Sequence, residues 1–215
     1  MTSKTAKNIV KKAKKKIKLE EEGIVEFTNC QPKEFLCHIK GIRPLLFSKF
    51  PDFDAKKPRK GEITDPKDIA KQCLYLDKKG KIYLPAEHLE GALIQGGKGW
   101  QIPGEGKATY TKEIAQNIIV IPQNVPFLFP EDPKDYTIDK RVVVANGKAR
   151  MWSFRPRWDE WEFKFTIRYE CSFGVKINRN VLVELLQRAG KYGVGTYRLK
   201  FGKFMPVSVT EVTSK

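Results

Sequence analysis

The residues best suited to chemistry lie in a glycine-rich, basic segment close to the C-terminal end of the chain. The residues in it that we single out after Gly190 are Gly193, Gly195, Gly202, Tyr197, Arg198 and Lys200. Glycine lets backbone N–H groups approach a phosphate closely, arginine and lysine supply charge, and a tyrosine ring can stack on a base. The combination predicts contact with a nucleic-acid backbone. The alternative is a helix that ends at Gly190 and a tight turn after it.

Residues 150–158 interleave three arginines with three aromatic residues, a pattern that suits phosphate contacts beside stacked bases. Arg155 and Arg157 are the better candidates for such contacts. Trp152 and Phe154 share the other face of the expected strand, so we expect at least one aromatic pair there to lie in the core. Further basic or aromatic candidates lie elsewhere in the chain: Arg43, Arg59, Lys60, Lys98 and Trp100.

Catalytic groups are scarce. The weak candidates for a nuclease are Asp52, Asp54 and His38, because acids in a loop can hold a metal ion and a histidine can act as a general acid. A lysine-rich polar loop commonly carries acids without a catalytic role, and a mid-strand histidine is commonly a satisfied sheet residue. Gly96-Gly97-Lys98 departs from the phosphate-loop spacing and follows a helix pattern. We expect binding without catalysis, and no cofactor.

A metal site is not indicated either. The four cysteines include no Cys-x-x-Cys pair, and only His38 and His88 could join them. We expect reduced structural thiols at these positions: Cys30, Cys37, Cys73 and Cys171.

The formal net charge is +16, from 41 basic and 25 acidic residues. Eight of the basic residues are lysines within the first 19 residues, which hold no acid, and the rest of the chain is still basic. Such a charge favours a polyanionic partner, although lysine-rich surfaces also serve solubility alone. Residues 1–22 are expected to form a basic arm, disordered when free, followed by a single domain over residues 23–215.

The apolar runs are too short to cross a bilayer, and the basic N-terminal segment leads into no apolar signal region. We therefore expect no membrane partner and a cytoplasmic location.

Hydrophobic periodicity places the main elements. From Trp161 to Tyr169 apolar and polar residues alternate strictly, which predicts a strand with one buried face. Asn146-Gly147 between apolar runs predicts a hairpin over residues 142–154. The other expected elements are a strand from Glu34 to Phe47 interrupted near Gly41 and Pro44, a short hairpin over 74–84, helices at 85–95 and 178–189, and a strand at 204–212.

Long loops are expected between these elements, at residues 51–68, 96–117 and 122–140. The element order predicts an α+β fold, a ferredoxin-like or RRM-like sandwich with an antiparallel sheet, two main helices on one face and long loop insertions.

Two short motifs resemble the RAMP superfamily, the RRM-fold backbone subunits of CRISPR effector complexes, and related uncharacterised phage and prophage proteins. In that family a short strand leads into a Pro-small-x-Leu-x-Gly-x-Leu helix start, matched here by Pro85, Ala86, Leu89, Gly91 and Leu93. A glycine-rich loop between the second helix and the last strand is matched by Gly193, Gly195 and Gly202. The similarity in element order spans residues 34–212.

The resemblance implies that the glycine loop and the basic face of the sheet grip a single-stranded RNA or DNA, with head-to-tail self-association along the strand. Two other functions stay open: an endoribonuclease of the RAMP type, and a structural protein that packages nucleic acid.

Overall fold

The computed structural model describes residues 32–50, 65–145, 149–170 and 177–212. The expected arm over residues 1–22 lies outside them, as do Asp52, Asp54, Arg59 and Lys60.

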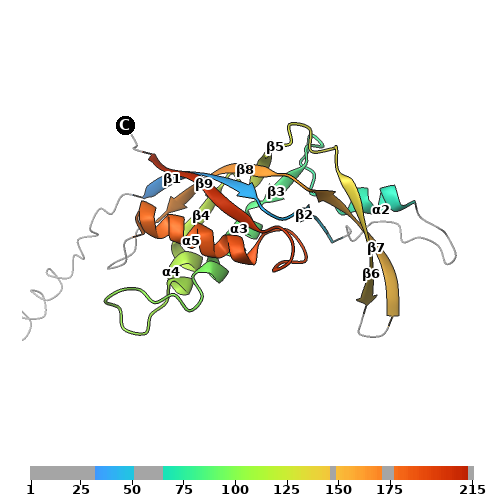
Figure 1. Cartoon of the computed structure of the whole chain (residues 1–215). Coiled ribbons are helices and arrows are strands. Elements are labelled where there is room, and N and C mark those ends of the chain that lie inside the picture. The colour runs from blue at the N-terminus through green and yellow to red at the C-terminus, as the bar shows by residue number, and fades with distance from the viewer. Residues whose placement is uncertain (1–31, 51–64, 146–148, 171–176, 213–215) are drawn as a thin grey trace, which may run out of the picture. The chain divides into compact units, whose positions relative to one another are not determined.

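An antiparallel sheet carries the core (Figure 1). Its strands follow the order β3 (Tyr83–Pro85), β5 (Asn124–Phe129), β8 (Glu162–Tyr169), β1 (Lys33–Gly41) and β9 (Phe204–Val212), while β4 (Ile118–Ile121) also pairs with β8. The alternation predicted for β8 is confirmed, because every second side chain from Trp161 to Tyr169 is buried. In β1, Phe35, Cys37 and Ile39 face the same core. Burial raises the pKa of the Cys37 thiol to about 12, so this thiol stays protonated.

The helices α3 (Ala86–Gly96), α4 (Tyr110–Asn117) and α5 (Arg179–Tyr192) cover one face of this sheet (Figure 1). The Asn178 side chain caps α5 by accepting a hydrogen bond from the Val181 N–H, as the sequence predicts. Helices α3 and α5 approach closely at Gly96, where an added Cβ would lie 2.9 Å from the Ala189 nitrogen. The predicted α+β, RRM-like sandwich is therefore confirmed. None of the described helices is long and apolar enough to span a membrane.

A second, smaller sheet consists of β2 (Leu45–Leu46), β7 (Ala149–Trp158) and β6 (Thr137–Ala145). The β6–β7 hairpin extends from the main sheet (Figure 1). It is longer than predicted, and its Asn146-Gly147 turn lies outside the described residues. Trp158 at the end of β7 is buried and packs against Phe47, which anchors this sheet to the core.

Three of the expected loops are partly wrong. Helix α2 (Pro66–Gln72) begins within the segment 51–68, with the Asp65 side chain as its cap. Helix α4 lies within 96–117, because Tyr110, Glu113 and Ile114 recur on one helical face and are buried there. Segment 122–140 contains β5 and the start of β6.

Prolines concealed the first of these strands, β5. In β5, Pro126 is exposed beside the short strand β3, a position where a missing backbone N–H is tolerated. The expected strand from Glu34 to Phe47 is also divided: β1 ends at Gly41, and β2 belongs to the smaller sheet.

Candidate nucleic-acid interface

The glycine-rich loop connects α5 to β9, at the end of α5 nearer to the smaller sheet (Figure 1). Helix α5 continues to Tyr192, so the predicted end at Gly190 is two residues early. Gly190 instead lies inside the helix, where an added Cβ would meet the Phe204 carbonyl oxygen at 2.0 Å. Its lack of a side chain lets α5 pack onto β9.

The glycines of this loop are buried against the protein's own backbone. Gly195 has φ +77°, and a Cβ there would lie 2.5 Å from the Leu46 carbonyl oxygen. Gly202 has φ +65°, and its Cβ would lie 1.9 Å from the Val194 carbonyl oxygen. Gly193 is placed similarly, with φ +89°.

The loop's amides are also largely used inside the protein. The N–H groups of Thr196 and Gly202 donate to the carbonyls of Leu46 and Pro44, at 2.9 and 2.8 Å. Further loop amides donate to backbone carbonyls of the loop and of α5: those of Gly193, Val194, Leu199, Lys200 and Phe201. This differs from the expectation that the loop's amides approach phosphates, because these amides already donate to carbonyls within the protein.

Two residues of the loop have an unusual backbone conformation. Tyr197 has φ +52° and Leu199 has φ +75°, although neither is glycine. Both are exposed, at 38% and 63%. Left-handed conformations of bulky residues are costly, and they persist where the surrounding structure imposes them, often at functional sites.

Cations of the β6–β7 hairpin stack on the aromatic rings of this loop. The guanidinium of Arg155 lies 4.4 Å from the centre of the Tyr197 ring, and that of Arg141 lies 4.4 Å from the centre of the Phe201 ring. The two rings are 6.5 Å apart. These contacts join the loop to the hairpin, and Arg141 with Phe201 lines a groove.

The groove has a volume of about 540 Å³ and is strongly basic. Its lining is Arg43, Pro44, Arg141, Arg157, Leu199, Lys200, Phe201 and Lys203. Arg141 and Arg157 pair with Asp139 and Asp159, respectively. The other three cations, Arg43, Lys200 and Lys203, have no ion-pair partner in the part of the chain that the structure describes. A groove with several unpaired cations beside aromatic rings suits a polyanionic single strand.

Several predicted residues therefore meet in one place. Arg43, Arg157 and Lys200 line the groove, and Tyr197 with Arg155 stands beside it. Sequence reasoning missed Arg141, Lys203 and Phe201. Lys203 and Phe201 flank Gly202, so their place in the same glycine-rich, basic segment is the signal that points to them. No sequence signal connects Arg141 to this loop, because it lies on β6.

Other predicted residues lie away from the groove. Arg198 is half-buried, its Nε donates to the Gly195 carbonyl, and its guanidinium lies 5.6 Å from the centre of the Tyr192 ring. The pKa of His88 is lowered to about 4, mainly because His88 is buried and secondly because the charge of Arg198 lies nearby. His88 is therefore neutral at neutral pH. Arg198 thus braces the loop against α3 and α5.

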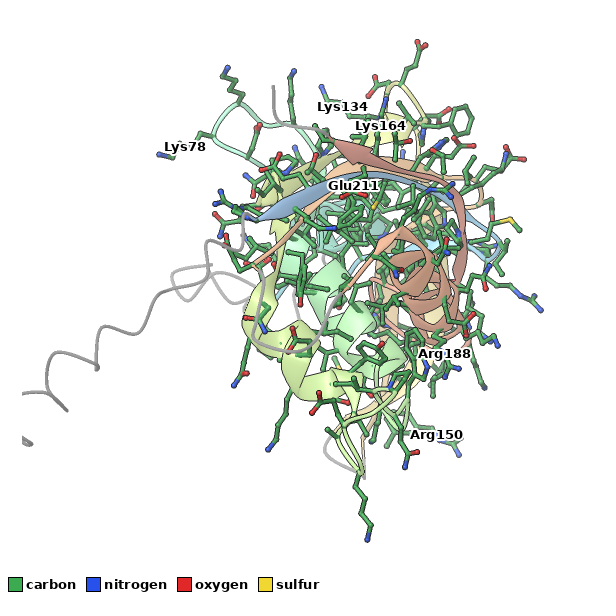
Figure 2. The ribbon with its side chains drawn as sticks, turned by 90° about the vertical axis from the view of Figure 1, so that its left-hand side faces the viewer. Lys78, Lys134, Arg150, Lys164, Arg188 and Glu211 are labelled. Atoms are coloured by element: carbon green, nitrogen blue, oxygen red, sulfur yellow. The ribbon has the colours of Figure 1, made fainter. Side chains whose placement is uncertain are left out.

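Lys98 and Trp100 follow α3 at a separate position. Trp100 packs against Tyr110 of α4, and the Arg188 guanidinium lies 4.6 Å from its ring centre. Figure 2 shows Arg188 on the helix side of the sheet. Packing between α4 and α5 accounts for Trp100, whereas Lys98 is exposed.

The candidate catalytic groups are not assembled among the described residues. His38 lies on the sheet face opposite the helices, and its Nε2 is 2.8 Å from Glu162 Oε2. Lys40 contacts the same carboxylate at 3.1 Å. No group of three or more metal-ligating side chains occurs in the described ranges.

The aromatic side chains of β7 do not all behave as predicted. Trp152 is 56% exposed and Phe154 is half-buried, so the pair on that face is not in the core, whereas Trp158 is buried. The Lys140 ammonium lies over the rings of Trp152 and Phe154, at 4.6 and 5.9 Å from their centres. Because the hairpin extends away from the main sheet, its distal face has no core to enter.

The comparisons with known proteins bear on the fold. No protein-family model matches the chain. No curated protein matches its sequence. Among solved structures 66 chains match, including one from the cryo-EM structure of the type III-B Cmr-beta complex bound to cognate target RNA. That chain is 13% identical, with a TM-score of 0.55, over 99% of this chain and 68% of the other. At this identity the likeness shows a shared fold.

Proposed function

We propose that this protein is a RAMP-like, non-catalytic subunit that binds single-stranded RNA along the groove between the glycine-rich loop and the β6–β7 hairpin. The observation that carries the proposal is the cluster of Arg43, Lys200 and Lys203, three cations that form no ion pair with the described residues, beside the ring of Phe201. Unpaired charges attract phosphates, and an adjacent ring offers a face on which a base can stack.

The fold supports RNA as the ligand. A chain of similar fold belongs to a complex that is bound to target RNA. Head-to-tail association of copies along the strand stays a prediction, as does the role of the basic arm over residues 1–22. The alternative of an endoribonuclease has less support, because His38 is paired with Glu162 on another face of the sheet.

The proposal is tested by fluorescence anisotropy with the full chain and a labelled, mixed-sequence RNA of about 20 nucleotides. We expect binding to the single strand to weaken linearly on a log–log plot as salt increases, with a slope of at least about −2 if three cations contact phosphates. The same strand placed in a duplex should bind more weakly, since its bases can no longer stack. Single-stranded DNA of the same sequence measures the contribution of the 2′-hydroxyl.

Gel analysis of the same RNA after incubation with Mg²⁺ separates binding from cleavage. We expect the RNA to remain intact. Equal affinity for the single strand and the duplex would contradict the groove as the binding site, and cleavage above that of a heat-inactivated sample would favour the endoribonuclease.

A further inference from the structure

Arg155 on β7 is a half-buried cation, and no residue that the structure describes forms an ion pair with it. Its Nε and Nη1 atoms are shielded from solvent, and neither has a hydrogen-bond partner among the described residues. A buried guanidinium that lacks acceptors is unfavourable, because the solvation it loses is not replaced. The protein nevertheless holds this side chain in place.

Among the described residues, the two acids of this part of the smaller sheet, Asp139 and Asp159, are already engaged. Asp139 is the cross-strand neighbour of Arg155 in the β6–β7 ladder. The two carboxylate oxygens of Asp139, however, accept hydrogen bonds from Nε and Nη2 of Arg141, at 2.5 and 2.8 Å, and Arg157 lies 3.9 Å away. Asp159 pairs with Arg157. Neither carboxylate is left for Arg155.

Two neutral groups, the Tyr197 ring and the Cys73 thiol, also neighbour Arg155. The Tyr197 ring lies against one face of the guanidinium. The charge of Arg155 reaches the Cys73 thiol, which also hydrogen-bonds Ser48, yet burial keeps the pKa of this thiol above its ordinary value. A protonated thiol and a phenol ring orient a guanidinium but do not neutralise it.

The chemistry of Arg155 suits a phosphate, and a phosphate that binds it must displace the atoms that cover Nε and Nη1 in the free protein. A guanidinium presents its N–H groups in a planar fork that matches two phosphate oxygens, and such charge-assisted pairs are strong. Tyr197 fixes the plane of the fork by stacking, and it does so from a backbone conformation of φ +52°. The strained tyrosine and the unpaired arginine are thus two parts of one arrangement.

We infer that Arg155 is a receptor for one phosphate group, with Tyr197 as its positioning residue. For a polymeric ligand the inference rests on the proposed function: Tyr197 is adjacent to Phe201, which lines the groove, so a strand in the groove places a phosphate at Arg155. This phosphate contact differs in kind from those at Arg43 and Lys200, because it is directional and partly shielded from solvent.

Arg155→Met tests the inference, because it removes the charge while keeping a long side chain against the ring. Without ligand, we expect its thermal midpoint to rise by about 2–4 °C, since an unsatisfied buried charge is removed. Its affinity for the single-stranded RNA should nevertheless fall by about 10-fold or more. A side chain with a merely structural role would lower the midpoint when replaced.

The matched control is Arg150→Met, on the same strand. Arg150 is exposed, and Figure 2 shows it pointing away from the rest of the molecule. Its replacement should leave the midpoint unchanged and reduce the affinity only slightly. Arg155→Lys keeps the charge but loses the fork, so it should bind RNA more weakly than the parent with a similar salt slope.

Pyrophosphate, compared with sodium chloride at equal ionic strength, distinguishes the source of the phosphate. Stabilisation of the parent by pyrophosphate that is lost in Arg155→Met assigns the site to free phosphates as well as RNA, and stabilisation by RNA alone assigns it to the polymer. If the parent binds no RNA but responds to pyrophosphate through Arg155, the phosphate site stands and the proposed function fails. A lower unliganded midpoint for Arg155→Met, or RNA affinity equal to that of Arg150→Met, overturns the inference.

Discussion

Gly202→Ala is expected to destabilise the protein by about 3 kcal/mol or more, which lowers the thermal midpoint by about 6 °C or more. Two effects add at this position. The backbone has φ +65°, which an alanine adopts only with strain, and the added Cβ would lie 1.9 Å from the Val194 carbonyl oxygen. The Gly202 N–H and carbonyl both hold backbone hydrogen bonds, to Pro44 and from Val194, so the segment has little freedom to shift away.

Gly80→Ala is the matched control for this prediction. Gly80 has a similar φ of +74°, but nothing lies within 4 Å of the position that its Cβ would occupy. It therefore isolates the backbone strain, which we expect to be about 1 kcal/mol. Thermal unfolding followed by circular dichroism measures both variants. Equal midpoints for the two would show that the protein's own backbone does not confine the loop.

The second large effect is expected from removing the unpaired charges of the groove. In the triple variant Arg43→Gln, Lys200→Gln and Lys203→Gln, affinity for single-stranded RNA should fall roughly 100-fold at 0.05 M salt. The slope of log K against log salt should become shallower by about 2, because three phosphate contacts are lost at about 0.7 each. Anisotropy titrations at several salt concentrations measure both quantities.

A control of equal charge change is available on another surface. Lys78, Lys134 and Lys164 are exposed, and none of them lines the groove. Figure 2 shows them at the top of the view, on the side of the sheet away from the helices. Replacing all three with glutamine should change the slope by much less. If both triple variants lose affinity equally, binding follows net charge rather than the groove.

Much of the fold could be predicted from the sequence where the hydrophobic pattern was long and regular. The alternation from Trp161 to Tyr169 and the Asn178 cap each specify an element through local physics alone, and both are present. Helix α4 and strand β5 were missed because they are short and lie among glycines or prolines. Their stability comes from tertiary contacts, such as the burial of Ile114 and Val125, which no local pattern reports.

The charged residues of the candidate site could be predicted from the sequence, but their assembly into one groove could not. Arg43, Arg157 and Lys200 stand out by residue type, yet their meeting in one groove depends on β2, β7 and the loop after α5 coming together. Sequence also cannot say what a glycine makes room for. In the loop, Gly195 and Gly202 leave space for the carbonyls of Leu46 and Val194 rather than for a ligand.

The most direct test of the central claim is a map of the contacts between the full chain and single-stranded RNA. RNA that carries 4-thiouridine is cross-linked to the protein by light, the complex is digested, and the linked peptides are identified by mass spectrometry. The account predicts cross-links at Tyr197 and Phe201 and in the peptides that contain Arg43 or Arg157. Cross-links confined to the sheet face around His38 and Lys164, or to residues 1–22, would contradict it.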